Sequence, residues 1–180
     1  MIKRLFDFTS AFFGLIILFP LLIIVSIIIK MTSRGAVFYK QERTGRNAEI
    51  FTIIKFRSMV ENHGDDNTVT VSGDQRITKF GAFIRKYKID ELPGLWNVLQ
   101  GEMSLVGPRP DLPYYYSLLK GEDRKILELR PGITGPASLK YANEEQILKL
   151  QDNPEKYHYD VIFKDKVKIN LAYYYKNNLW

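Results

Sequence analysis

An adjacent acidic pair, Asp90-Glu91, is the part of the sequence whose residue types best suit catalysis. One interpretation is structural: Asp90 would cap the N-terminus of a helix, and Glu91 would lie in its first turn, where negative charge is favourable. The other is chemical: an ionised Asp90 beside a phosphoryl group can act as a nucleophile and form an acyl phosphate. Glu91 could then join Asp90 in holding a divalent metal ion that neutralises phosphate charge.

Several arginines near this pair favour the chemical interpretation. Arg85 precedes the pair by five residues, and Arg76 lies further upstream. Arg109 stands between two prolines and Arg130 precedes Pro131-Gly132, so the backbone of both arginines is restricted. A guanidinium group held in this way suits bidentate binding of phosphate. These four arginines are therefore predicted to bind the phosphates of a substrate.

The composition limits the metal and nucleotide sites that the chain can form. It has no cysteine and only two histidines, which excludes cysteine-based zinc sites and a histidine-rich metal cluster. A metal would therefore have oxygen ligands, as magnesium and manganese do. The sequence contains no Walker A loop, GxGxxG turn or GxSxG elbow, so it lacks the usual signals of NTPases, Rossmann domains and serine hydrolases.

Near the N-terminus, residues 8–29 form an apolar segment of 22 residues without a charge. As a helix this segment would extend about 33 Å, which is enough to cross a bilayer. A single spanning anchor is the simplest interpretation, but two features favour a re-entrant helix. Pro20 near the middle would kink the helix. Basic residues flank both ends, which by the positive-inside rule places both ends in the cytoplasm: Lys3, Arg4, Lys30, Arg34 and Lys40.

The sequence is thus predicted to divide into a re-entrant membrane helix, residues 1–34, and a catalytic domain at the membrane surface, residues 35–180. The net charge of +6 lies entirely in the first third of the chain. Residues 1–60 hold nine Lys/Arg against three Asp/Glu, whereas residues 61–180 hold seventeen of each. A basic surplus beside an apolar segment favours anionic lipid over nucleic acid as the partner.

The catalytic domain is predicted to be α+β and mostly helical, with amphipathic interfacial helices around the active site. Residues 36–40 and 49–56 are rich in β-branched and aromatic side chains and predict a small β-hairpin, with residues 43–47 as its turn. Residues 61–74 are polar and predict a surface loop.

Two helices are predicted to flank the acidic pair. The first begins at Thr78 as N-cap, and its apolar face is expected to pack in the core: Phe80, Phe83, Ile84 and Tyr87. The second begins at Asp90 as N-cap and ends at Gly101. Its apolar face is formed by Leu92, Leu95, Trp96 and Leu99.

The rest of the chain carries weaker signals. A further helix is predicted to start at Asp111 and Pro113, and residues 130–132 end the segment that follows it. In the C-terminal region a stripe at helical spacing is formed by Val167, Leu171 and Tyr174/Tyr175. That stripe fits either a helix packed on the core or a helix on the membrane surface.

Taken together, these patterns resemble the bacterial sugar transferase family. Within it they are most similar to the small monotopic phosphoglycosyl transferases, which are polyprenol-phosphate hexose-1-phosphate transferases. The resemblance runs in order through most of the chain and rests on Lys3-Arg4-x-x-Asp7, Lys55-Phe56-Arg57-Ser58-Met59, Asp74-x-Arg76-x-Thr78-x-x-Gly81, Asp90-Glu91-Leu92-Pro93, Asn97-Val98-Leu99-x-Gly101 and residues 103–110 and 130–135.

The resemblance implies a two-step reaction. Asp90 would attack the sugar-bearing phosphate of a UDP-sugar, release UMP and hold the phosphosugar until polyprenol (undecaprenyl) phosphate accepts it. Glu91 would complete the dyad, and Mg²⁺ would be required. Arg85 and Arg109 would bind phosphates or the nucleotide, and Lys55 and Arg57 would lie near the site.

The resemblance also implies a location and a pathway. The active site would lie on the cytoplasmic face of the bacterial inner membrane, below a re-entrant helix bent at Pro20. The reaction would be the first membrane step of polysaccharide or glycoconjugate biosynthesis. Residues 136–141 depart from the family pattern, as does Phe19, where the family often has serine before the kink proline. The identity of the sugar is therefore left open, and a homodimer is one candidate assembly.

Two alternatives to this function remain at the level of sequence. A membrane-anchored glycosyltransferase would move the sugar without its phosphate and release UDP. A non-enzymatic membrane-bound binding module would use the acidic pair only to cap a helix.

Overall fold

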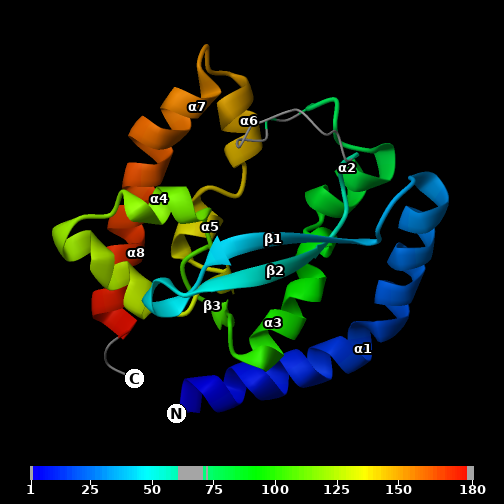
Figure 1. Ribbon diagram of the computed structural model, residues 1–180, viewed down its shortest axis with the longest axis horizontal. Coiled ribbons are helices and arrows are strands. Elements are labelled where there is room, and N and C mark those ends of the chain that lie inside the picture. The colour runs from blue at the N-terminus through cyan, green and yellow to red at the C-terminus, as the bar shows by residue number, and fades with distance from the viewer. Residues whose placement is uncertain (1, 61–70, 72, 178–180) are drawn as a thin grey trace.

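A long N-terminal helix, a β-hairpin and a series of short helices make up the computed structural model, which describes residues 2–60, 71 and 73–177 (Figure 1). The predicted α+β, mostly helical class is confirmed. The described strands form two separate pairs, one antiparallel and one parallel. The loop predicted at residues 61–74 lies almost wholly outside the described residues.

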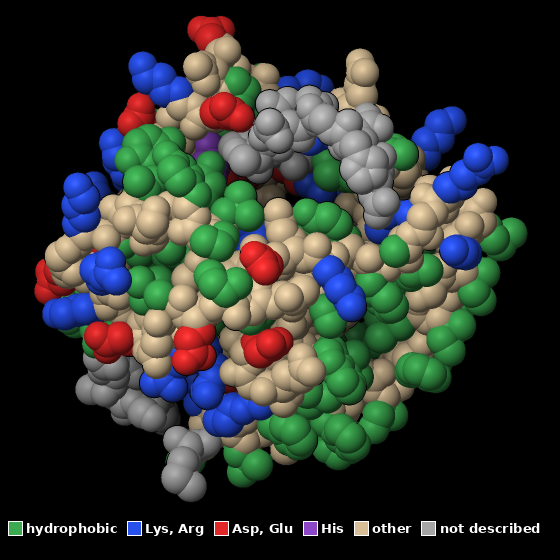
Figure 2. Space-filling view, in the orientation of Figure 1, with side chains coloured by type: hydrophobic (Ala, Val, Ile, Leu, Met, Phe, Trp, Pro, Cys, Tyr) green, Lys and Arg blue, Asp and Glu red, His purple; other side chains and the backbone are tan. Residues whose placement is uncertain are grey.

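Helix α1, Ile2–Thr32, is one continuous helix that contains Pro20. Figure 1 shows that it changes direction, running along the lower edge of the molecule and then up one side. Within the described residues it is the single helix whose length and composition would let it cross a membrane. Its apolar side chains line that edge in Figure 2, and the largest exposed ones include Phe6, Phe13, Ile17, Phe19 and Ile24.

The predicted hairpin is confirmed. Strands β1, Phe38–Thr44, and β2, Ile50–Phe56, pair antiparallel through their whole length, and the short 3-10 turn η1, Arg46–Ala48, connects them. The first strand continues to Thr44, past its predicted end at residue 40. As a consequence, Arg43 belongs to a strand and not to the turn.

Helix α2, Lys79–Lys86, begins where the sequence predicts, because Thr78 Oγ1 accepts a hydrogen bond of 2.8 Å from Gly81 N. Gly81 also lets the helix dock closely, since a Cβ at this position would lie 1.9 Å from the carbonyl oxygen of Ser58. The docking brings α2 against the residues that follow β2.

The expectation that all four apolar residues of α2 lie in the core is wrong. Ile84 is fully buried and Phe80 is partly buried, but Phe83 and Tyr87 are 51% and 58% exposed. A helix of eight residues that docks through Gly81 buries only a narrow face. The rings of Phe83 and Tyr87 instead pack on each other, with centroids 5.0 Å apart.

The acidic pair lies in a 3-10 turn and does not cap an α-helix. Turn η2, Ile89–Gly94, precedes α3, Leu95–Gln100, which ends at Gly101 as predicted, with a φ of 90°. The cap position of η2 is occupied by Lys88 in the left-handed region, at φ 56°. The prediction of Asp90 as an N-cap is therefore wrong, because the chain tightens into η2 one turn before α3 begins.

The apolar face predicted for α3 is also only partly right. Leu95 is buried, but Trp96 is 51% exposed, and the two fully buried residues of this helix are Asn97 and Val98. The buried Asn97 connects α3 to the hairpin: its side chain accepts from Ile54 N at 3.1 Å and donates to Thr52 O at 2.8 Å. These bonds satisfy polar groups that would otherwise be costly to bury.

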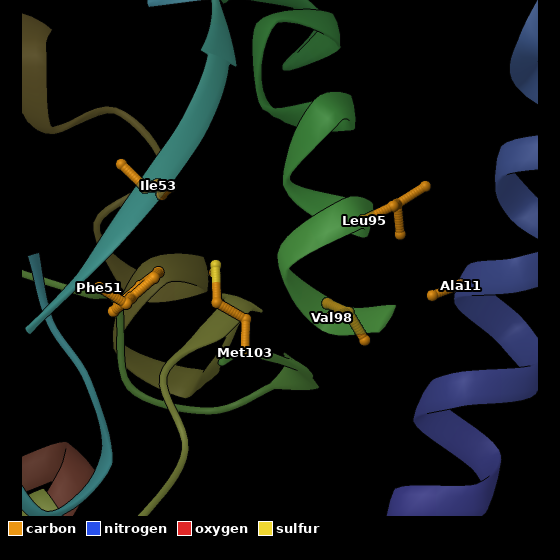
Figure 3. Close-up of a cluster of buried hydrophobic side chains, with 6 residues drawn as sticks. All are labelled: Ala11, Phe51, Ile53, Leu95, Val98 and Met103. Carbon is orange, nitrogen blue, oxygen red and sulfur yellow. The ribbon is translucent and has the colours of Figure 1, made fainter. Parts of the chain in front are cut away.

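The central hydrophobic cluster joins α1, β2 and α3 (Figure 3). Burial of a Leu or Phe side chain of this kind contributes about 1.5–3 kcal/mol. Helix α1 therefore contributes to the core of the protein. The members of the cluster are Ala11, Phe51, Ile53, Leu95, Val98 and Met103.

A second, parallel pair of strands was not predicted. Strand β3, Ser104–Val106, pairs with β4, Gly132–Thr134. The two segments approach so closely that a Cβ on Gly132 would lie 2.1 Å from Gly107 N. This contact fixes the backbone on which Arg109 stands, three residues after β3.

The remaining helices form the C-terminal half of the molecule. In chain order they are α4 Pro113–Ser117, η3 Gly121–Glu128, α5 Pro136–Lys140, α6 Glu144–Lys149, α7 Pro154–Tyr157, the π-helical η4 His158–Phe163 and α8 Lys164–Asn177. Val167 and Leu171 of α8 pack against a buried cluster that includes Tyr116 and Ile126. Of the two interpretations of the C-terminal stripe, the structure favours packing on the core for these two residues.

Both ends of α1 are attached to the same folded body. Near its start, Arg4 donates to Leu99 O, at the end of α3, at 2.9 Å. At its other end, the buried Arg57 donates to Ser33 O at 2.9 Å and to Arg34 O at 2.6 Å. The segment between these anchors carries the exposed apolar side chains.

Candidate active site

Glu91 is held in place by two cations from different parts of the chain. Its Oε1 lies 3.0 Å from Lys55 Nζ, which β2 provides, and 2.7 Å from Arg109 Nη2. Arg109 Nη1 also donates to Glu91 Oε2 at 3.2 Å, so the pair is bidentate. A bidentate pair fixes the orientation of the guanidinium group and of the carboxylate as well as pairing their charges.

The charges of this cluster perturb one another. Burial alone would raise the pKa of Glu91, but Arg109 and Lys55 outweigh it and hold that pKa well below its usual value. Burial and the charge of Arg109 lower the pKa of Lys55 to about 8, with Glu91 opposing them. Burial would lower the pKa of Arg109, yet Glu91 outweighs it, so the pKa rises. Glu91 is therefore a permanent anion between two cations.

Asp90 has a different environment from its neighbour. It is only 6% exposed, and its Oδ1 is buried without a hydrogen-bond partner among the described residues. Burial, followed by the nearby charge of Glu91, raises the pKa of Asp90, while Lys55 and Arg85 oppose the rise. A buried carboxylate oxygen without a partner is unusual and marks a site that a ligand can complete.

A cavity of about 550 Å³ opens beside this cluster. Its size is typical of ligand pockets. Glu91 and Arg109 line it, together with Arg43, Arg85 and Lys88. Lys55 lines a smaller adjoining cavity that also includes Glu91 and Arg109. Asp90, the residue before Glu91 in the chain, is not among the residues that line these two cavities.

Arg85 joins this cavity from α2. Its guanidinium forms an ion pair with Glu145 of α6, and its Nη1 lies 3.4 Å from Ser58 Oγ. The structure therefore brings together Asp90, Glu91, Lys55, Arg85 and Arg109, all of which were candidates from the sequence.

Three other candidate residues do not line this cavity. Arg57 binds the end of α1, as described above. Arg76 forms an ion pair with Asp74, with Nη2 2.7 Å from Oδ2. Arg130 donates to Gly101 O at 2.9 Å and lines a separate cavity.

The structure also places residues at the site that the sequence analysis missed. Arg43 and Asp111 line the cavity beside Arg109. Burial lowers the pKa of Arg43, and its Nε is buried without a partner among the described residues. From the C-terminal half come Glu144, His158 and Lys166. The sequence carried no signal for Arg43, because it follows Lys40, Gln41 and Glu42 in a strand that is mostly polar.

The fit of a metal ion depends on which oxygens are free. No group of three or more His, Asp or Glu residues that could hold a metal occurs within residues 2–60, 71 and 73–177. Both oxygens of Glu91 already accept from cations, whereas Asp90 Oδ1 has no partner among these residues. The site thus fits an ion such as Mg²⁺ that keeps water and substrate phosphates as most of its ligands, with Asp90 as the available carboxylate.

The arrangement is suited to chemistry on a phosphoryl group. The buried carboxylate of Asp90 has a free oxygen and lies near Lys55 and Arg85, and Arg109 lines the cavity beside them, so these cations can stabilise developing negative charge. The arginines also suit phosphate recognition.

Comparisons with known proteins agree with one another. The family model described as bacterial sugar transferase matches residues 1–180. The chain is 41% identical over 155 residues to an undecaprenyl-phosphate glucose phosphotransferase of Komagataeibacter xylinus, covering 82% of this chain and 29% of that protein. It is 40% identical over 142 residues to the uncharacterized sugar transferase EpsL of Bacillus subtilis (strain 168), covering 79% and 70% of the two chains.

A third relative is a UDP-glucose:undecaprenyl-phosphate glucose-1-phosphate transferase of Xanthomonas campestris pv. campestris, which is 39% identical over 142 residues. That match covers 76% of this chain and 29% of the relative. The chain thus spans less than a third of the Komagataeibacter and Xanthomonas proteins but most of the Bacillus protein. The match of the whole chain to the family model, together with these relatives, shows that the chain belongs to the bacterial sugar transferase family.

Proposed function

We propose that the protein transfers a sugar-1-phosphate from a UDP-sugar to polyprenol phosphate through a covalent intermediate on Asp90. The observation that carries this proposal is the buried Asp90 Oδ1, which has no hydrogen-bond partner among the described residues and lies next to the Glu91–Lys55–Arg109 cluster. That cluster lies at the edge of a cavity. Membership of the sugar transferase family supports it, as do relatives named as undecaprenyl-phosphate sugar phosphotransferases.

In the first step, Asp90 Oδ1 attacks the phosphorus that bears the sugar. The bond from this phosphorus to the bridging oxygen of the diphosphate breaks, and UMP leaves with the electron pair. Arg109, Lys55 and Arg85 stabilise the negative charge that develops on the phosphoryl oxygens. In the second step, a phosphate oxygen of the polyprenol phosphate attacks the same phosphorus and releases the Asp90 carboxylate.

Glu91 acts in both steps through its neighbours. It holds Arg109 in a bidentate contact and Lys55 in a single one, so the two cations stay oriented when the substrate arrives. Bound Mg²⁺, with Asp90 as its protein ligand, would supply further neutralisation of phosphate charge.

The way in which α1 is anchored supports the proposed re-entrant arrangement in the membrane. A helix that spans the bilayer has its ends on opposite sides, but Arg4 and Arg57 attach the two ends of α1 to one folded body. Pro20 and the change of direction in α1 support a re-entrant helix at residues 1–34. Residues 35–180 then form the catalytic domain on the cytoplasmic face of the bacterial inner membrane, within reach of a lipid acceptor.

The reaction is tested by the identity of the released nucleotide. The protein incubated with a UDP-sugar and no lipid should release about one UMP per molecule and gain the mass of one sugar phosphate. Asp90→Asn should do neither, whereas Asp152→Asn, a change of an exposed aspartate, should do both. Release of UDP, or an Asp90→Asn variant that still forms the lipid product, would contradict the proposal.

The topology is tested by labelling, because the chain has no native cysteine. Cysteines in Ile2→Cys and Arg34→Cys variants, both at exposed positions, should react with a membrane-impermeant maleimide from the cytoplasmic side only. Labelling of the two positions from opposite sides would establish a spanning helix.

A further inference from the structure

The cavity has a second charged group, separate from the Lys55–Glu91–Arg109 cluster but also built from one carboxylate between two basic side chains. Glu144 begins α6, His158 begins η4 and Lys166 lies in α8. Glu144 Oε2 is 2.6 Å from Lys166 Nζ, and Glu144 Oε1 is 3.2 Å from His158 Nε2. All three residues line the cavity.

The geometry of this group holds the carboxylate of Glu144 towards the cavity. The side chains of His158 and Lys166 are 11% and 9% exposed, whereas that of Glu144 is 23% exposed. A carboxylate has about four sites for accepting hydrogen bonds. Two of those of Glu144 are taken by protein donors, so its outer sites remain for a ligand.

The His158 ring is itself unusual. The residue is 8% exposed, its Nδ1 is buried without a hydrogen-bond partner among the described residues, and the ring of Tyr115 packs against it at 5.2 Å. A purely structural histidine in the core would be expected to satisfy both ring nitrogens. The contact that its ring does make, from Nε2 to Glu144, is the one expected of a residue that positions the carboxylate.

The charge of Glu144 limits what it can bind. An ionised carboxylate accepts hydrogen bonds but donates none, so it does not bind phosphate oxygens, and the diphosphate of the donor belongs with Arg85 and Arg109. Glu144 nevertheless lies close enough to Arg109 to contribute to its raised pKa. A group bonded directly to the diphosphate and rich in hydroxyl donors fits this position, because hydroxyls donate to carboxylates.

We propose that Glu144 accepts hydrogen bonds from hydroxyl groups of the donor's sugar and thereby determines which UDP-sugar is used, with His158 and Lys166 positioning its carboxylate. This inference rests on the proposed function. The ribose of the nucleotide also carries hydroxyls beside the diphosphate, so the experiment must separate the two sources.

The experiment compares kcat/KM for UMP release from UDP-glucose, UDP-galactose, UDP-N-acetylglucosamine and UDP-N-acetylgalactosamine. Glu144→Gln should lower the value for the preferred donor about 10- to 100-fold, as for loss of hydrogen bonds to a charged group. The values for the other donors should fall less, so that the preference shrinks. Inhibition by UMP should not change.

Other variants keep the test decisive. Glu155→Gln, a change of an exposed glutamate, is the control and should leave the preference intact. Lys166→Gln should weaken the preference and Lys166→Arg should restore it. If Glu144→Gln fails to fold, Glu144→Asp keeps the charge for Lys166 but retracts the carboxylate, and it should also alter the preference.

The contrary outcomes are distinct. An equal loss for every donor, with weaker inhibition by UMP, would place Glu144 at the ribose and overturn the inference. An unchanged preference in a folded Glu144→Gln or Glu144→Asp variant would also overturn it while leaving the proposed function intact. If the wild-type protein released no UMP from any donor, the proposed function itself would fail.

Discussion

Two sets of basic residues in this protein have the same chemistry but different partners. In the first set, for which we propose a catalytic role, Lys55 and Arg109 bind the carboxylate of Glu91 beside the cavity. In the anchoring set, Arg4, Arg57 and Arg130 donate to backbone carbonyls at helix ends and turns. An arginine bound to a carboxylate in a cavity can exchange part of that contact for a phosphate, whereas an arginine that satisfies buried carbonyls is committed to the fold.

The first way to test this comparison is to change Arg109. Arg109→Lys removes the bidentate contact with Glu91 and should lower kcat/KM for UMP release about 100- to 1,000-fold, as for loss of one donor to a developing oxyanion. The melting temperature should change little. A variant that unfolds but keeps its activity per folded molecule would move Arg109 into the anchoring set.

Arg57 tests the other side of the comparison. Arg57→Ala leaves Ser33 O and Arg34 O without their donor and should lower the free energy of unfolding by about 2–4 kcal/mol. Denaturant unfolding in detergent measures the loss. The rate of UMP release per folded molecule should persist, and a lost rate with unchanged stability would instead assign Arg57 to the substrate site.

The role of Lys55 can be tested through the pH dependence of the rate. Its pKa of about 8 lies below the usual value for lysine, so its positive charge is lost as the pH rises through about 8. If that charge stabilises the transferred phosphate, kcat/KM should fall towards tenfold per pH unit above this point. In Lys55→Arg the decline should move to higher pH, because arginine stays charged.

The lowered pKa of Lys55 should affect stability in the opposite direction from activity. A lowered pKa means that the folded state binds the proton of Lys55 less tightly than the unfolded state does. Between about pH 8 and the ordinary lysine range, the contribution of Lys55 to stability therefore rises with pH. Activity and stability should diverge in this window, which a pH series of melting temperatures alongside rates would show.

Arg130 should give the smallest effect. Arg130→Gln removes one donor to Gly101 O and should cost about 1 kcal/mol of stability. The rate should not change, because Arg130 lines a cavity separate from that of Glu91. A large loss of rate would show that the second cavity takes part in the reaction.

Local signals in the sequence predicted much of the first half of the fold. The hairpin followed from β-branched and aromatic residues, the start of α2 from Thr78 and the end of α3 from Gly101. Each depends on contacts within a few residues. The parallel pair β3–β4 could not be predicted, because two strands of three residues each carry no periodicity and meet only through tertiary packing.

The site was predicted in part for the same reason. The dyad and Arg109 lie in local patterns that restrict the backbone, and the structure brings them together. The sequence could not show that Arg109 and Arg130 have different roles, because both stand beside a proline. They differ only in their tertiary contacts, which are Glu91 for Arg109 and Gly101 O for Arg130. Glu144, His158 and Lys166 meet across three helices, so no spacing in the sequence reveals them.

The contact of α1 with the core has a consequence for how the protein is made. Ala11 packs with Leu95, Val98 and Met103, which the ribosome adds long after α1 has emerged. Until then the apolar surface of the helix needs shielding, by a bilayer or by a chaperone. A fragment expressed without residues 1–34 would leave this surface uncovered and should aggregate. Trimming α1 to obtain a more soluble protein would therefore remove part of the interior.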